Sequence, residues 1–177
     1  MAIVFAMFAA SGYFIWSHLY QDALKIRSFN FDKDAASVDA LFHKGDNWYW
    51  MICNANSAHY SMDFFLRYQT SSQAEKKYDM VSKVATFDER VVGFLAYYPD
   101  SQRVWRLLFL IVDHDFRGQG IAKKLLKYAV EDMLHRGAIE IILYTRNNNF
   151  KAQSLYKNFG FKVLRSDSEG MHFIWHR

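Results

Sequence analysis

The chain has 177 residues, 51% of them hydrophobic, which supports one domain with a substantial core and is too short for two domains of ordinary size. Cys53 is the only cysteine, which excludes an intrachain disulfide framework and a cysteine-built zinc site. A chain without disulfides is compatible with a reducing compartment. The formal net charge is +4, and residues 101–177 hold 13 basic and 7 acidic side chains against 9 and 11 in residues 1–100, which favours an anionic partner for the second half.

The N-terminal segment is apolar. Sixteen of the first twenty residues are apolar, and Asp22 is the first charged side chain. A helix over residues 1–20 would measure roughly 30 Å, enough to cross a hydrocarbon core. Lys25 and Arg27 follow it, which favours a cytoplasmic location for the rest of the chain. We therefore separate residues 1–21, a candidate membrane anchor, from a domain over residues 22–177; an apolar element packed on the domain and a cleaved signal peptide remain alternatives.

The first part of the domain predicts a strand followed by a helix. Residues 24–30 alternate apolar and polar side chains, and residues 32–42 have a helical composition with Asp32 as the candidate N-cap. Residues 43–77 are less regular, and we expect one helix near residues 60–70. Their aromatic run Trp48-Tyr49-Trp50 suits core packing or an apolar wall for a substrate.

Three strands are expected next, over residues 79–87, 91–98 and 104–112. Polar turns separate them at Asp88-Glu89-Arg90 and at Pro99-Asp100-Ser101. The third strand contains the run LLFLIV, which is typical of a strand buried on both faces. The short connections predict that the three strands are antiparallel neighbours.

From Ile121 the spacing of the apolar residues changes to the period of a helix. Apolar residues from Ile121 to Leu134 form one stripe, and Gly137 is a candidate C-cap before a strand over residues 138–145. A strand, a helix and a parallel strand make a βαβ unit. A second helix over residues 150–158, with Asn149 as its N-cap, leads to closing strands over 161–165 and 171–175.

A glycine-rich turn precedes the first of these helices. Arg117-Gly118-Gln119-Gly120 stands directly before Ile121, where the unpaired N–H groups of a helix start can bind an anion if the backbone can approach closely. Lys123 occupies the position of the third glycine of the dinucleotide fingerprint, and no P-loop pattern is present. The turn therefore suits a phosphate or pyrophosphate, with a plain tight turn as the alternative.

The sequence patterns on both sides of this turn are a more specific signal than the glycine turn alone. The segment from Val112 to Ala122 resembles the acyl-CoA pyrophosphate motif of the GNAT superfamily of N-acyltransferases, Gln/Arg-x-x-Gly-x-Gly/Ala. The segment from Asn149 to Phe161 is similar to the second signature of that superfamily, Asn-x-x-Ala-x-x-Leu-Tyr-x-x-x-Gly-Phe. Both motifs occur in the right order, and the resemblance covers about residues 104–162.

This resemblance implies a mixed α/β (α+β) fold: one GNAT-like domain with a central twisted sheet of about six to seven strands, helices on both faces, an antiparallel N-terminal half and a βαβ unit at the CoA site. It also implies a set of cofactor-binding residues. The backbone that would hydrogen-bond the pantetheine arm belongs to Leu110, Ile111 and Val112, and the residues that would hold the pyrophosphate are Arg117, Gly118, Gln119, Gly120, Ile121, Ala122 and Lys123. Asn149 would contact CoA or act only as a helix cap, and Tyr156 would be the general acid that protonates the departing CoA thiolate.

The general base is not assigned. Some members of the superfamily place a glutamate in the strand before the glycine turn, where this chain has Arg106. Candidates elsewhere are Asp113-His114-Asp115, Glu140, Tyr97, Tyr98 and His172, and no pattern selects among them. We expect no metal, because His172 and His176 would lie roughly 13 Å apart along a strand.

We therefore expect an acyltransferase that moves the acetyl group of acetyl-CoA directly to a primary amine of a small molecule or protein. A non-catalytic acyl-CoA-binding module is the alternative. The chain shows no aromatic-basic motif for nucleic acid, so we expect no such partner. A membrane could be a partner through residues 1–20. The acceptor, the acyl chain length and the choice between monomer and homodimer are left open.

Overall fold

The computed structural model describes residues 24–44 and 80–177. Three predicted features lie outside the described residues: the apolar segment 1–21, the aromatic run Trp48-Tyr49-Trp50 and the helix near residues 60–70. Within the described ranges, no helix combines the length and the apolar character needed to cross a membrane.

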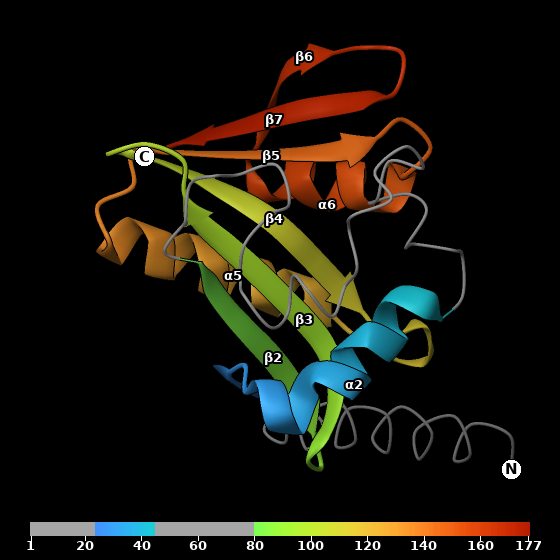
Figure 1. Ribbon diagram of the computed structural model, residues 1–177. Helices are drawn as coiled ribbons and strands as arrows, with labels where there is room; N and C mark the ends of the chain where they lie inside the picture. Colours follow the sequence, from blue (N-terminus) through green and yellow to red (C-terminus); the bar gives the residue numbers. More distant parts are fainter. Residues whose placement is uncertain (1–23, 45–79) are drawn as a thin grey trace, which may run out of the picture.

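Strands and helices follow the predicted order, with small shifts at their ends. They are β1 (Lys25–Ser28), α2 (Phe31–His43), β2 (Val81–Phe87), β3 (Arg90–Pro99), β4 (Val104–Val112), the 3-10 helix η1 (His114–Phe116), α5 (Ile121–His135), β5 (Glu140–Arg146), α6 (Phe150–Phe159), β6 (Lys162–Ser166) and β7 (Gly170–His176). The strands form one seven-stranded sheet in the order β1-β2-β3-β4-β5-β7-β6 (Figure 1). Among the described strands, only β4 and β5 pair in parallel, as expected for a right-handed crossover through α5. The predicted mixed fold is confirmed.

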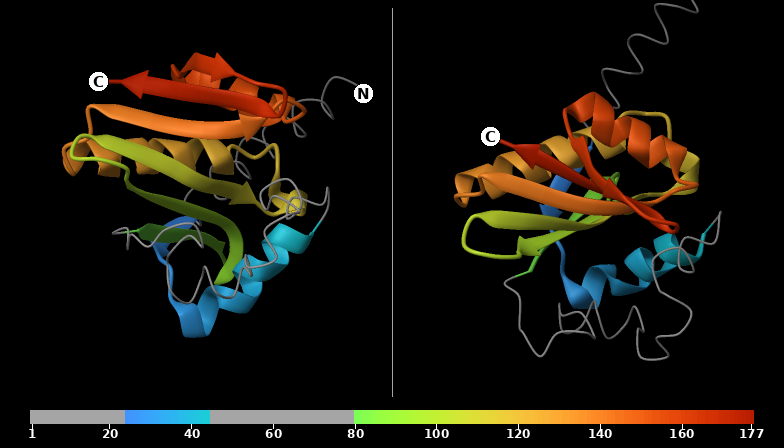
Figure 2. Two further views of the ribbon diagram at one scale, coloured as in Figure 1. Left: turned by 45° about the horizontal axis from the view of Figure 1, so that its top comes forward. Right: turned by 90° about the horizontal axis from the view of Figure 1, so that it is seen from above.

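Helices cover both faces of the sheet (Figure 2), and each face has its own core of buried side chains. On one face, α5 and α6 pack on the sheet through buried side chains such as Leu125, Tyr156 and Phe173. On the other face, α2 contributes Val38 and Phe42 to a smaller cluster with residues of β2, β3 and β4. The amphipathic stripes of the helices therefore produce a layered domain.

The first helix begins one residue earlier than predicted. Its N-cap is Asn30 rather than Asp32, because the Asn30 side chain accepts the backbone N–H of Lys33 at 3.1 Å. Asp34, in the first turn, is buried and receives two hydrogen bonds from the Arg27 guanidinium, at 2.7 and 2.8 Å. This pair fastens α2 to β1.

A bulge in β4 changes which side chains face each core. Ala96 pairs with Phe109 and Tyr97 with Leu107, so Leu108 is an extra residue. Before the bulge Leu107 packs in the α5 core, and after it Phe109 packs in the α2 core. Side chains of β4 therefore pack in the cores on both faces of the sheet, and none of the nine residues of the strand is exposed, which agrees with the predicted burial on both faces. The bulge determines which side chain enters which core, since it re-aims the strand.

Candidate active site

The parallel strands β4 and β5 separate halfway along their length. Their pairing runs from Val104 with Glu140 to Leu107 with Leu143. In the part of the chain that the structure describes, no pairing joins residues 108–112 of β4 to residues 144–146 of β5. Both strands continue, and the two strand directions open toward their carboxyl ends (Figure 1). We call this region the β4–β5 divergence.

Backbone groups of β4 face this divergence. The N–H of Asp113 donates to the carbonyl of Val92 at 2.9 Å, which sets the alternation of hydrogen-bonded pairs along the β3–β4 ladder. In that register Ile111 hydrogen-bonds β3, while the backbone N–H and C=O groups of Leu110 and Val112 point away from it. Of the three strand positions predicted to offer backbone, Leu110 and Val112 have the suitable direction.

The glycine turn lies directly beyond β4. Gly118 and Gly120 both have φ of +79°, a left-handed conformation that favours glycine. Apart from the chain neighbours, a Cβ atom at either position would meet no atom of the described residues within 4 Å, so within that part of the chain both glycines border open space. Gly120 is the N-cap of α5 without a side-chain hydrogen bond, and the first intrahelical bond runs from Lys124 N–H to its carbonyl. Three helix N–H groups are therefore left for a ligand: those of Ile121, Ala122 and Lys123.

Arg117 connects this turn to the strand. Its Nε donates to the carbonyl of Val112 at 3.3 Å, and Gly118 and Gln119 that follow are exposed. The structure thus brings the predicted strand and turn residues together at the amino end of α5. The arrangement is that of an anion site beside a strand edge that no described strand pairs with.

Asn149 caps α6, as predicted, because its side chain accepts the N–H of Ala152 at 3.2 Å. The cap fixes the start of the helix that carries Tyr156. A buried glutamine supports the same connection: Gln153 donates to the carbonyls of Arg146 and Asn147, at 3.1 and 2.9 Å. The loop between β5 and α6 is therefore held by side chains of the helix itself.

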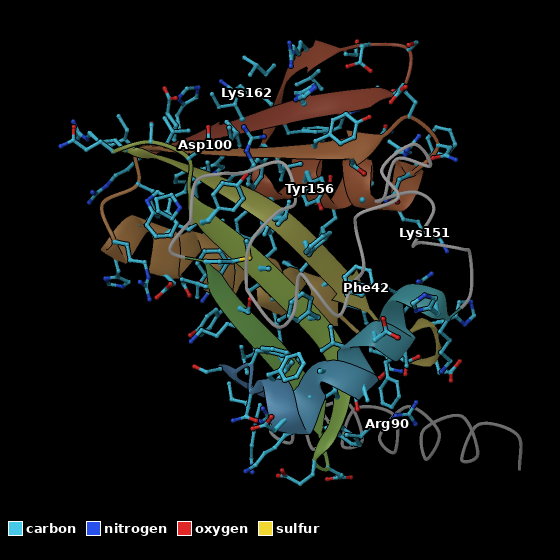
Figure 3. The ribbon with its side chains drawn as sticks, viewed as in Figure 1. Phe42, Arg90, Asp100, Lys151, Tyr156 and Lys162 are labelled. Carbon is cyan, nitrogen blue, oxygen red and sulfur yellow. The ribbon has the colours of Figure 1, made fainter. Side chains whose placement is uncertain are left out.

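Tyr156 is a buried side chain of α6. The side chain is 7% exposed, and its ring packs against Phe161 and Phe173, with centroids 5.9 and 5.8 Å apart. No described residue hydrogen-bonds its hydroxyl. Burial raises the pKa of Tyr156 above its usual value, so the phenol keeps its proton. Figure 3 labels Tyr156 on α6 and Phe42 on α2, on opposite faces of the sheet. A buried, protonated and unpartnered hydroxyl is suited to donate to a ligand.

Tyr97 is not available as a base. It is fully buried, and its hydroxyl donates to Asp132 of α5 at 2.6 Å. Burial, followed by this hydrogen bond, raises the pKa of Tyr97 far above its usual value. Arg106 also has a partner, since its Nε donates to Asp100 at 3.0 Å. Both side chains therefore serve the fold.

Asp113 is the centre of an ion-pair network at the end of β4. Its carboxylate, 4% exposed, accepts Lys44 Nζ and Arg90 at 2.8 Å each, and the backbone N–H of Asp115 at 3.1 Å. Burial alone would raise the pKa of Asp113, but these hydrogen bonds outweigh it and lower the pKa. Lys44 also pairs with Asp115 at 2.5 Å. Lys44 and Arg90 were not predicted as site residues, because they lie 69 and 23 residues away along the chain.

Taken together, a mixed sheet that opens between two parallel strands, a glycine turn at a helix start and a buried tyrosine define an acyltransferase type of fold. The model of the acetyltransferase (GNAT) family matches residues 42–161. The chain belongs to this family, which confirms the resemblance seen in the sequence.

Curated relatives match part of the chain. It is 33% identical over 108 residues to human N-acetyltransferase 8B, covering 52% of this chain and 48% of the relative. It is 37% identical over 84 residues to N-alpha-acetyltransferase 30 of Schizosaccharomyces pombe, covering 45% and 56%. It is 34% identical over 87 residues to the Bos taurus thialysine N-epsilon-acetyltransferase, covering 46% and 50%. The chain therefore spans about half the length of these relatives.

Solved structures share the fold across most of the chain. The PaiA N-acetyltransferase of Thermoplasma acidophilum in complex with coenzyme A has a TM-score of 0.66 at 22% identity, covering 87% of this chain and 99% of that one. A GCN5-related N-acetyltransferase from Kribbella flavida has a TM-score of 0.72 at 17% identity, covering 89% and 99%. At such identities the likeness concerns the fold.

Proposed function

We propose that this protein is an N-acetyltransferase that transfers the acetyl group of acetyl-CoA to a primary amine, without a covalent enzyme intermediate. The observation that carries the proposal is the buried Tyr156 hydroxyl without a hydrogen-bond partner among the described residues. An unpartnered buried hydroxyl costs the unliganded protein free energy. A ligand atom that the Tyr156 hydroxyl protonates would account for the presence of this hydroxyl on the helix that follows the β4–β5 divergence.

Acetyl-CoA fits the residues around the divergence. The backbone of Leu110 and Val112 would hydrogen-bond the pantetheine amides, as an added strand does. The N–H groups at the start of α5 would hold the diphosphate, with Gly118 and Gly120 allowing close approach. The residues proposed to hold the nucleotide end are Arg117, Gly118, Gln119, Gly120, Ile121, Ala122 and Lys123. Asn149 is kept as a candidate contact in addition to its capping role.

Tyr156 would act as the general acid. The acceptor nitrogen attacks the thioester carbonyl carbon, the C–N bond forms, and the C–S bond breaks with its electron pair on sulfur. Tyr156 donates its proton to that sulfur, and the ammonium nitrogen loses one proton to a base. The products are an amide and the free thiol of CoA, and the phenol regains a proton from water.

The acceptor is proposed to be a primary amine. The names of the relatives describe one N-alpha-acetyltransferase and one N-epsilon-acetyltransferase acting on thialysine. These names support both α-amino and ε-amino groups as acceptors to test. Since direct attack needs the neutral amine, an amine of pKa ~10.4 must first lose a proton at pH 7.

A non-catalytic acyl-CoA-binding module remains the second candidate. Arg106, bonded to Asp100, stands where some members of the family have a glutamate base, and that departure favours a binding role. Release of thiol from acetyl-CoA in the presence of an amine separates the two candidates, because a module would bind acetyl-CoA and release none.

Two matched substitutions test the site. Gly120→Glu places a carboxylate at the start of α5, and Gly137→Glu places one at the opposite end of that helix. Both glycines have positive φ, +79° and +94°, and open space at the Cβ position. Each substitution should therefore cost about 1–2 kcal/mol of folding free energy from backbone strain. Only Gly120→Glu should repel the diphosphate, by roughly 1–4 kcal/mol, which corresponds to an acetyl-CoA affinity weaker by about 5- to 1,000-fold.

Isothermal titration calorimetry of both folded variants with acetyl-CoA gives the comparison, and thiol release with thialysine, lysine and a peptide with a free α-amino group gives the activity. Equal affinities for the two variants would refute the assignment of the glycine turn. Tight binding with no transfer to any of the amines would favour the binding module.

A further inference from the structure

A tyrosine and a histidine face each other across β5 and β7. Tyr144 and His172 are direct cross-strand partners, and their ring centroids lie 4.9 Å apart. The strand neighbours Leu143 and Phe173 belong to the core under α5 and α6. Because side chains alternate along a strand, Tyr144 and His172 lie on the opposite face of the sheet.

The Tyr144–His172 pair lies at the point where β5 separates from β4. Leu143 is the last residue of β5 that pairs with β4, so Tyr144 is the first residue of β5 beside the β4–β5 divergence. Tyr156 approaches from the other face, where its ring packs on Phe173, the chain neighbour of His172. Tyr156 and His172 therefore flank this part of the sheet from opposite faces.

Asp167 fixes the surroundings of the histidine. Its Oδ2 lies 3.7 Å from His172 Nε2, near enough to stabilise a positive imidazolium. Its Oδ1 accepts the N–H groups of Glu169 and Gly170, both at 2.9 Å, so the carboxylate is held by the turn between β6 and β7. Gly170 also sets the position of Tyr144, since a Cβ there would lie 2.5 Å from the Tyr144 hydroxyl.

Charged groups from several elements face His172. Burial lowers the pKa of His172 below its ordinary value, and Arg165 of β6 and Arg106 of β4 act in the same direction. Asp167 opposes them without reversing the shift. Tyr144 of β5 completes the surroundings, and burial raises the pKa of its phenol, which keeps that phenol neutral. The imidazole is therefore neutral at pH 7, and its side chain is 22% exposed, so it can accept a proton.

We propose that His172 is the general base that takes the proton of the acceptor amine, directly or through one water, with Asp167 as its positioning residue. This inference rests on the proposed N-acetyltransferase function. As the amine nitrogen bonds to the carbonyl carbon, its N–H proton passes to the imidazole. The departing sulfur receives a different proton, from Tyr156 on the other face. The imidazolium then releases its proton to water, so that one thioester and one amine yield one amide and one thiol.

His176 provides a matched control. It lies on the same face of β7 as His172, and its Nδ1 is 3.5 Å from a carboxylate, that of Glu140. However, Glu140 is at the end of β5 that pairs with β4, away from the divergence. His172→Gln and His176→Gln therefore remove the same group from the same strand face, and only the first removes it beside the proposed reaction centre.

The full chain and both variants are assayed for thiol release from acetyl-CoA with thialysine, lysine and a peptide with a free α-amino group, between pH 5.5 and 9.5. We expect His172→Gln to lose about 100-fold in kcat/KM at pH 7, within the usual range for a general base. The loss should persist as pH rises toward the amine pKa of ~10.4, because the free amine still loses an N–H proton to the imidazole as the amide forms. The His176→Gln profile should follow the wild type, and melting temperature and acetyl-CoA affinity should be unchanged in both variants.

Equal profiles for the wild type and His172→Gln would overturn the inference and leave the proposed function standing. Absence of thiol release by the wild type with all three amines would count against the proposed function instead. In that case an NMR titration decides the inference without an acceptor: saturation with acetyl-CoA should shift the imidazole C–H signal of His172 and not that of His176. An unmoved His172 signal would overturn the assignment.

Discussion

Replacing Tyr156 by phenylalanine separates folding from catalysis. The substitution removes only the hydroxyl, and the ring contacts with Phe161 and Phe173 remain. Since no described residue hydrogen-bonds that hydroxyl, its loss removes a desolvation penalty and no hydrogen bond to the described part of the chain. We therefore expect the unliganded variant to be as stable as the wild type or more stable.

The expected gain in stability of Tyr156→Phe follows from the burial of the Tyr156 hydroxyl. A buried polar group without a partner costs about 1–3 kcal/mol, and Tyr156 is 7% exposed. Recovery of about 1 kcal/mol would raise the melting temperature by roughly 2–4 °C in a protein of this size. Tyr97→Phe is the control, because the Tyr97 hydroxyl donates to Asp132 at 2.6 Å. That variant should lose about 1.5–3 kcal/mol, the usual contribution of a hydrogen bond to a charged group.

Activity should move in the opposite direction. A general acid contributes about 10²- to 10⁴-fold, and a thiol of pKa ~8.5 is already a fair leaving group. We therefore expect Tyr156→Phe to lower kcat about 100-fold, with the acetyl-CoA affinity nearly unchanged.

Thermal denaturation with and without acetyl-CoA, together with thiol-release kinetics, measures both effects on the same samples. A loss of stability as large as that of Tyr97→Phe would show that the Tyr156 hydroxyl has a protein partner. An unchanged kcat would refute its role as the acid.

Two further predictions concern the charges around the site and the start of the chain. Asp113→Asn should lower the free energy of unfolding by about 2 kcal/mol at pH 7, since the variant weakens hydrogen bonds to two cations. Because the pKa of Asp113 is lowered in the folded protein, the stability that its carboxylate contributes is present above the unfolded pKa of ~3.9 and is lost as pH falls through the folded pKa. Urea titrations should therefore show that the difference in unfolding free energy between wild type and variant shrinks below about pH 4. A difference that stays constant with pH would contradict this. Removal of the apolar residues 1–21 should shift the protein from the membrane pellet to the supernatant after sedimentation, and equal partitioning with the full chain would refute the predicted anchor.

Local patterns in the sequence determined most of the elements. The apolar stripe from Ile121 to Leu134 and the positive-φ glycines at 118, 120 and 137 depend on residues close together in the chain. The same holds for the helix cap at Asn149, whose side chain accepts the N–H of Ala152, three residues further along the chain. Such features are predictable because helix periodicity, caps and turns involve neighbours in sequence.

The resemblance to the family also led us to propose Tyr156 as the general acid, but it did not predict the environment of that side chain. Only the packing of α6 on β7 shows that Tyr156 is buried, with no hydrogen bond between its hydroxyl and a described residue. In the same way, Tyr97 was a candidate base until its hydrogen bond to Asp132, 35 residues along the chain, removed it. Burial and partner choice depend on segments that are distant in sequence, so composition and period do not determine them.

The sequence by itself thus determined the family, the strand–turn–helix unit and the glycine turn, because these are local and have fixed spacing. The tertiary structure decided where β4 parts from β5, since this depends on a bulge at Leu108 and on the register with two neighbouring strands. It also decided that His172 lies opposite Tyr144 and that Asp113 joins Lys44 to Arg90. These contacts follow from strand pairing across long stretches of chain, and no pattern within one stretch specifies its partner in another.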